Sequence, residues 1–202
     1  MPVATPTPLS ALSVAERSAT PVTGSRTMAR GAFTACVAIY AMLRLTDPTW
    51  WDLLDDVNLA VHEAGHVLFG LFGDIPGVLG GSLFQVMIPA IFAGYFFRSR
   101  QRFSAAITLA WVAQSMVNVS VYIKDARAQD LPLLGGEASI HDWWYILINW
   151  DLLKYDLQIG GFVHFVAALL FLTALGMGAL ITYRDAETDR SVPTTPPPRL
   201  HS

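Results

Sequence analysis

Long apolar runs separated by short polar segments dominate the hydrophobic pattern of this chain. The four longest runs cover residues 31–45, 78–97, 103–123 and 160–183. A helix needs about 20 largely apolar residues to cross the hydrocarbon core of a bilayer. The pattern therefore predicts an all-α fold, a polytopic membrane helix bundle with about four transmembrane helices.

A further helix is predicted between the first two runs, and it differs from them because polar side chains interrupt it. Asp52 is placed to cap its start, and the sequence Gly73-Asp74-Ile75-Pro76-Gly77 is expected to break it. Within it lies His62-Glu63-Ala64-Gly65-His66. Because ionisable groups are costly inside a bilayer, we expect this helix to be interfacial or re-entrant.

Composition agrees with a membrane protein and sets the domain limits. Hydrophobic residues make up 53% of the chain and charged residues 14%. Residues 1–27 and 184–202 are polar and rich in proline, so we expect disordered tails on either side of a membrane domain at 28–183. The lipid bilayer is the expected partner. Nucleic acid is not, because no basic surface carries interleaved aromatic residues.

The distribution of basic residues predicts the orientation of the bundle, because cytoplasmic loops carry an excess of Lys and Arg. If the histidine helix does not cross, 9 basic residues lie inside and 4 outside; if it crosses, the split is 6 to 7. The 9 are Arg17, Arg26, Arg30, Arg98, Arg100, Arg102, Arg184, Arg190 and Arg199, and the 4 are Arg44, Lys124, Arg127 and Lys154. We therefore expect a multi-pass cell-membrane protein with both termini cytoplasmic and the histidine helix near the outer surface.

The histidine segment has the spacing of a zinc site. In a helix, His62 and His66 lie on one face about one turn apart, so both imidazoles can bind one Zn²⁺ ion. Glu63 lies roughly 100° round the helix from His62, where it can act as the general base on a metal-bound water. The alternative is a metal-free polar seam, in which both histidines form hydrogen bonds between helices.

A third zinc ligand has several candidates. Asp125 ends a polar stripe that also holds Gln114, Asn118 and Tyr122, and a carboxylate there completes a site of two histidines and one carboxylate. For Gln114 and Asn118 we expect hydrogen bonds between helices. The alternative third ligands are His141, Asp142 and His164. Asp55 lies on the face of His62 and His66, and we expect it to orient an imidazole from outside the ligand set.

The five residues from His62 to His66, on an apolar helix of a multispan chain, resemble the site-2 protease class of intramembrane zinc metalloproteases. That resemblance implies that His62 and His66 bind zinc and that Glu63 is the catalytic base. The third ligand of that family is an aspartate in a later span, within a Leu-Asp-Gly type sequence, which this chain does not contain. The segments 120–127 and 133–136 are similar to small uncharacterised bacterial multi-pass membrane proteins.

Two functions follow as hypotheses. The first is a membrane-embedded zinc metallopeptidase that hydrolyses a peptide bond near the outer membrane surface, with a membrane protein or peptide as its substrate. The second is a non-catalytic membrane subunit or scaffold, in which a structural zinc ion or a polar network holds the histidine helix on the bundle. The short polar loops favour the second, because they leave little surface for holding a substrate.

Overall fold

The computed structural model describes residues 23–131 and 141–191, and its regular elements are all helical, with no strand in those ranges. Four helices are long: α2 (Thr23–Thr46), α4 (Asp74–Arg98), α5 (Arg102–Lys124) and α7 (Asp156–Ser191). The short elements are α3 (Leu53–Phe69), η1 (Gly70–Phe72), α6 (Asp142–Asn149) and η3 (Leu153–Tyr155).

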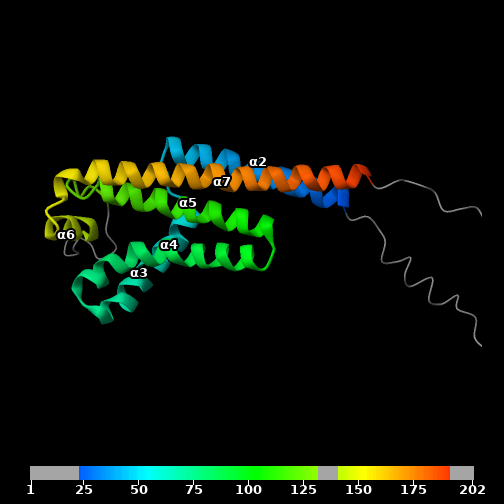
Figure 1. Cartoon of the computed structure of the whole chain (residues 1–202). Helices are drawn as coiled ribbons and strands as arrows, with labels where there is room; N and C mark the ends of the chain where they lie inside the picture. The colour runs from blue at the N-terminus through cyan, green and yellow to red at the C-terminus, as the bar shows by residue number, and fades with distance from the viewer. Residues whose placement is uncertain (1–22, 132–140, 192–202) are drawn as a thin grey trace, which may run out of the picture.

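The predicted all-α bundle is confirmed. The segments long and apolar enough to cross a membrane are Gly24–Thr46, Asp74–Arg98, Arg102–Lys124 and Leu153–Ser191. The chain is therefore assigned to the membrane proteins. Figure 1 shows α2 and α5 running in one direction and α4 and α7 in the other. The α4–α5 turn lies at the end where α2 begins and α7 ends, and α6 lies at the opposite end.

α5 lies at the centre of the bundle, where it packs most extensively against α7 and also contacts α4 and α2. Small side chains make this packing close, since Ala113, Val117 and Ala167 are fully buried. Phe171 and Ala174 extend the same cluster along α7. The central position of α5 matters for the site, because α5 carries most of the polar residues that face α3.

α3 begins with the predicted Asp52 cap. The Asp52 carboxylate accepts a hydrogen bond from Leu54 N at 2.7 Å, and the Asp55 carboxylate accepts one from Asp52 N at 3.0 Å. This reciprocal pair satisfies two backbone donors of the first turn. At the other end, Gly73 has a φ of 115°, a conformation that favours glycine, and the chain there turns from η1 into α4.

The faces of α3 are the reverse of those of a water-soluble helix. Its buried residues are Asp55, Asn58, His62 and Gly65. By contrast, Leu53 is 79% exposed and Val67 is 78% exposed. Polar groups turned inward and apolar groups turned outward suit a helix that has protein on one side and lipid on the other. α3 lies alongside the first half of α4 (Figure 1), as expected of a re-entrant helix.

Glycine allows the close approach of α3 and α4. A Cβ atom on Gly65 would lie 2.3 Å from the carbonyl oxygen of Gly80, and one on Gly80 would lie 2.5 Å from Phe69 Cβ. Any side chain at either position would therefore push the two helices apart. This contact brings the histidine face of α3 directly against α4.

Helices α2 and α7 extend into the segments expected to be tails. Residues 23–27 belong to α2 and residues 184–191 belong to α7. The two extensions hold each other, because Arg30 forms an ion pair with Asp185 and Thr27 Oγ1 donates a hydrogen bond to Asp189 Oδ2 at 2.9 Å. The rest of the expected tails, 1–22 and 192–202, lie outside the described residues.

Candidate metal centre

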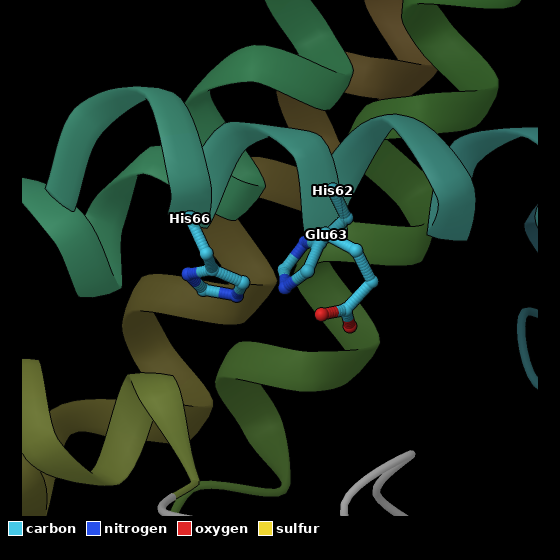
Figure 2. A group of neighbouring side chains, drawn as sticks. All are labelled: His62, Glu63 and His66. Carbon is cyan, nitrogen blue, oxygen red and sulfur yellow. The ribbon is translucent and has the colours of Figure 1, made fainter.

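His62 and His66 project from the same side of α3, as their spacing predicts (Figure 2). Their ring centroids are 4.6 Å apart, and the rings stand nearly perpendicular, at 80°. One ligand atom from each of His62, Glu63 and His66 lies within 4.8 Å of the others. Three side chains able to bind a metal therefore converge at one point on the helix.

A carboxylate from a distant part of the chain completes this group. Asp142 Oδ2 lies 3.0 Å from His62 Nε2 and 3.2 Å from His66 Nε2. Asp142 is the first residue of α6, and its side chain is only 12% exposed. Two imidazole nitrogens and one carboxylate oxygen thus meet between α3 and α6.

Contacts with α4 and α5 hold α6 in the position that places Asp142. The Asp142 backbone N–H donates to Tyr122 Oη on α5 at 3.3 Å, and Trp143 Nε1 donates to Ser82 Oγ on α4 at 3.0 Å. His141 caps the helix, since its Nδ1 accepts from Trp144 N at 3.3 Å. Leu147 of α6 belongs to a buried hydrophobic cluster with Val119 and Ile123 of α5, and Ile159 and Val163 of α7 pack against that cluster.

The other nitrogen of each imidazole faces a carbonyl oxygen. His66 Nδ1 lies 2.8 Å from the backbone oxygen of Gly77, and His62 Nδ1 lies 3.0 Å from Gln85 Oε1. A carbonyl oxygen can only accept, so in both rings Nδ1 carries the proton and donates it. Nε2 of each ring is therefore the nitrogen that faces Asp142, and an Nδ1–H held by a carbonyl oxygen is the arrangement found in metal-binding histidines.

Three acceptor atoms at this spacing attract a cation. When no metal is bound, a proton can take that place, and the hydrogen bond with Asp142 raises the pKa of His66 to about 9 although burial opposes the rise. Burial would raise the pKa of Asp142, but hydrogen bonds from His62 and His66 outweigh it and hold this pKa below its ordinary value. The negative charge at Asp142 thus persists close to both rings.

The same atoms suit a zinc ion. Ligands about 2.0–2.2 Å from a tetrahedral zinc stand about 3.3–3.5 Å from one another, close to the separations between Asp142 and the two rings. Space beside the rings is kept by Gly81 of α4, where a Cβ atom would lie 2.6 Å from both Nε2 atoms. A donor set of two imidazoles and one carboxylate is a common one for catalytic zinc.

Glu63 differs from His62, His66 and Asp142 in its exposure. It is exposed, and Figure 2 shows its carboxylate projecting from α3 on the same side as the two rings. Its carboxylate lies within 4.8 Å of one ring nitrogen of His62 and one of His66, close enough to exchange a proton with a molecule bound there. The fourth position of such a site, left open by three protein ligands, is where water binds in catalytic zinc centres.

The other predicted ligands lie in different surroundings. Asp125 caps α5 and accepts hydrogen bonds from the backbone N–H groups of Asp130 and Leu131 and from His141 Nε2, at 3.0–3.1 Å. His141 is thereby engaged at both ring nitrogens. His164 on α7 lies 3.4 Å from Ser120 Oγ. The geometry favours Asp142, one of the alternatives from the sequence, over Asp125.

Asp55, which was expected to orient an imidazole, forms its hydrogen bonds with other residues. Its Oδ1 atom instead accepts hydrogen bonds from Arg44 Nη2, Gln114 Nε2 and Asn118 Nδ2, at 3.1, 2.7 and 3.1 Å. Burial raises the pKa of Asp55, and the hydrogen bond from the Asp52 backbone and the charge of Arg44 oppose that rise. The expected hydrogen bonds of Gln114 and Asn118 between helices are confirmed.

Sequence reasoning missed several residues that shape the site. Gln85 is the partner of His62, Gly77 supplies the acceptor for His66, and Gly81 keeps the space beside both rings. A signal for Gln85 was present, since it is an isolated amide inside an apolar run and such residues need a partner. No comparable signal marks Gly77 and Gly81. The sequence does not distinguish a glycine that borders a site from one that allows two helices to approach, because that difference depends on packing.

Comparison of the chain with protein-family models, with curated proteins and with solved structures finds no significant match.

Proposed function

We propose that this protein is a membrane-embedded zinc metallopeptidase that cleaves a peptide bond near the outer membrane surface. The observation that supports it is the convergence of His62 Nε2 and His66 Nε2 on Asp142 Oδ2, at 3.0 and 3.2 Å, with Glu63 beside them. Each imidazole is oriented by a carbonyl acceptor at Nδ1. A polar seam that served only to join helices would not need Nε2 of both rings on one carboxylate oxygen.

Each residue of the proposed site has a role that follows from its side-chain chemistry. His62, His66 and Asp142 would hold the ion, and Glu63 is left free of it. When bound, zinc supplies Lewis-acid activation of a water molecule and of the scissile carbonyl. The Glu63 carboxylate accepts the proton of the attacking water and then passes it to the leaving amine, as a general base and acid.

The charges of the described residues support an outer location. The end of the bundle that holds the α4–α5 turn carries seven basic residues, and the end that holds α6 carries four. Cytoplasmic ends are enriched in such residues, so this distribution supports an outer position for the α6 end and the site. A substrate that reaches Glu63 there would approach along the apolar, exposed face of α3.

A second candidate function is a non-catalytic membrane subunit. It is favoured by the polar seam between α3 and α5, in which Asn58 accepts from Trp111 Nε1 and Ser115 Oγ and donates to Gln114 Oε1. These contacts bind α3 to the bundle whether or not a metal is present. In such a protein the carboxylate of Glu63 would have no catalytic role.

The test compares Glu63→Gln with Asp56→Asn, which neutralises another exposed carboxylate of α3. New peptide termini in membrane fractions are measured by mass spectrometry for cells that produce each variant at equal levels. General-base catalysis contributes about 10²–10⁴-fold, so termini that depend on the wild type should fall by at least about 10²-fold in Glu63→Gln and persist in Asp56→Asn.

The same comparison can refute the proposal. If Glu63→Gln yields the same termini as the wild type, or if no terminus depends on the wild type while His62→Ala impairs the cells, the protein is the non-catalytic subunit. Zinc content measured in parallel serves as a control, because Glu63→Gln should keep its zinc in both readings, and a loss of cleavage with zinc retained is then due to the missing base.

A further inference from the structure

We infer that the bilayer is thinner beside the connection between α2 and α3 than around the rest of the bundle, on the side where α6 lies. The connection covers residues 47–52. The water surface there lies about 8 Å deeper than at the ends of α5 and α7. The inference concerns the lipid around the protein, so it goes beyond the proposed peptidase and does not depend on a metal.

The first apolar run is too short to cross a bilayer of ordinary thickness. Residues 31–45 are 15 residues, which span about 22 Å as a helix. The apolar run of α5, residues 103–123, has 21 residues and spans about 32 Å, and a typical hydrocarbon core is about 30 Å thick. Because a bilayer thins locally around an apolar segment that is too short, α2 favours thinner lipid than α5 does.

Contacts between α2 and α7 show where α2 ends along the bundle. Gly178 faces Thr34, since a Cβ atom on this glycine would lie 3.0 Å from Thr34 Oγ1. The two helices run in opposite directions (Figure 1), and Asp47 and Phe165 each lie 13 residues from that contact, from 34 to 47 and from 178 to 165. Asp47, the residue after α2, therefore lies level with Phe165.

α5 and α7 continue beyond this level, toward α6 (Figure 1). Gly160, five residues from Phe165, faces the end of α5, because its Cβ atom would lie 2.5 Å from Lys124 Cγ. Five residues of helix correspond to about 8 Å. A second contact agrees with this depth: Asp55, in the first turn of α3, accepts from Asn118 Nδ2 at 3.1 Å, six residues before Lys124.

The exposed side chains at this depth differ between the two helices. On α7, Phe165 is 58% exposed, and Phe162, nearer to α6, is 66% exposed. At the connection, Asp47 and Thr49 are exposed, and Thr49 Oγ1 donates to the Asp47 carboxylate at 2.9 Å. A carboxylate is costly in hydrocarbon. A flat bilayer that covers both phenylalanines would bury Asp47, whereas a bilayer that thins at the connection suits both sides.

Two tryptophans mark the lowered surface. Trp50 and Trp51 are 43% and 53% exposed, and Trp51 Nε1 donates to Asp56 Oδ1 at 2.9 Å. Tryptophan is enriched where lipid meets water, because its ring is apolar and its N–H is polar. Asp56 and Glu63 are both exposed and, seven residues apart, share one face of α3. A lowered surface therefore brings water to the face of α3 that carries Glu63.

Spin labels on single cysteines, in a Cys36→Ala background, test the inference. Asp47→Cys and Phe165→Cys are compared in vesicles of dioleoylphosphatidylcholine. The readouts are collision rates with oxygen, which concentrates in hydrocarbon, and with nickel ethylenediamine diacetate, which stays in water. The matched controls, Ile39→Cys and Leu172→Cys, lie about level with each other at positions that are 58% and 64% exposed. We expect the label at position 47 to collide mainly with the nickel complex, and the other three mainly with oxygen.

A flat bilayer predicts the same surroundings for the labels at positions 47 and 165, because they lie at one depth. Both labels in lipid, or both in water, would therefore overturn the inference. A label at position 47 that collides with neither reagent would show that a second copy of the chain covers the connection, and this result also refutes local thinning. Thr49→Cys replaces Asp47→Cys if that variant does not fold. The measurement needs no metal, so its outcome is independent of the proposed zinc site.

Discussion

His62 and Asp142 meet at 3.0 Å although 80 residues separate them in the chain. One lies on α3 and the other begins α6, the short helix after the third candidate span. Their contact joins the two elements at the end of the bundle where α6 lies (Figure 1), and it turns a local two-histidine pattern into a three-residue donor set.

Gly81→Ala should weaken zinc binding, because the added Cβ would lie 2.6 Å from both Nε2 atoms. Overpacking costs about 1–3 kcal/mol, which corresponds to roughly a 5- to 150-fold loss of affinity. The control is Gly94→Ala in the same helix, where a Cβ meets nothing within 4 Å. Titration of both variants with Zn²⁺ checks this, and equal affinities would show that Gly81 does not border the metal.

Asp55→Ala should destabilise the protein strongly, because it leaves the buried Arg44 without its counter-ion. Breaking a buried pair costs about 3–5 kcal/mol. The matched control is Asp185→Ala, whose partner Arg30 has a side chain that is 19% exposed, and there we expect about 1 kcal/mol or less. Unfolding in detergent micelles measures both, and similar losses would contradict the role given to the buried pair.

The orientation of the bundle can be tested with single cysteines in a Cys36→Ala background. Cysteines at Arg100 and Ser191 should react only with reagents that reach the cytoplasm, and one at Asn149 should react from outside. These positions are exposed and lie at opposite ends of the bundle. If Asn149 and Arg100 exchange sides, the site faces the cytoplasm and the charge argument is wrong.

Much of the fold could be predicted from the sequence because its signals are local. Run length and hydropathy predicted the four apolar helices, and Asp52 marked the start of α3. The ends of α2 and α7 extend beyond the apolar runs, so hydropathy did not reveal them. Polar contacts between the two helices, such as the hydrogen bond from Thr27 to Asp189, stabilise these ends.

The site was predicted only in part, for a physical reason. The positions of His62, Glu63 and His66 relative to one another follow from helix geometry. The choice between Asp125 and Asp142 does not, because it depends on how α6 docks against α4 and α5. Asp125 also has a local role, as the acceptor of two backbone N–H groups at the end of α5, and that role removes it from the site.

The most direct test of the account is the zinc content of purified Asp142→Ala and Asp125→Ala beside the wild type. Each substitution removes one aspartate carboxylate, and the two residues lie in neighbouring segments, so a general loss of stability would affect both variants. We predict about one zinc per chain in the wild type and in Asp125→Ala, and a loss of zinc in Asp142→Ala. Zinc retained in Asp142→Ala, or absent from a gently purified wild type, would contradict the metal centre proposed for His62, His66 and Asp142.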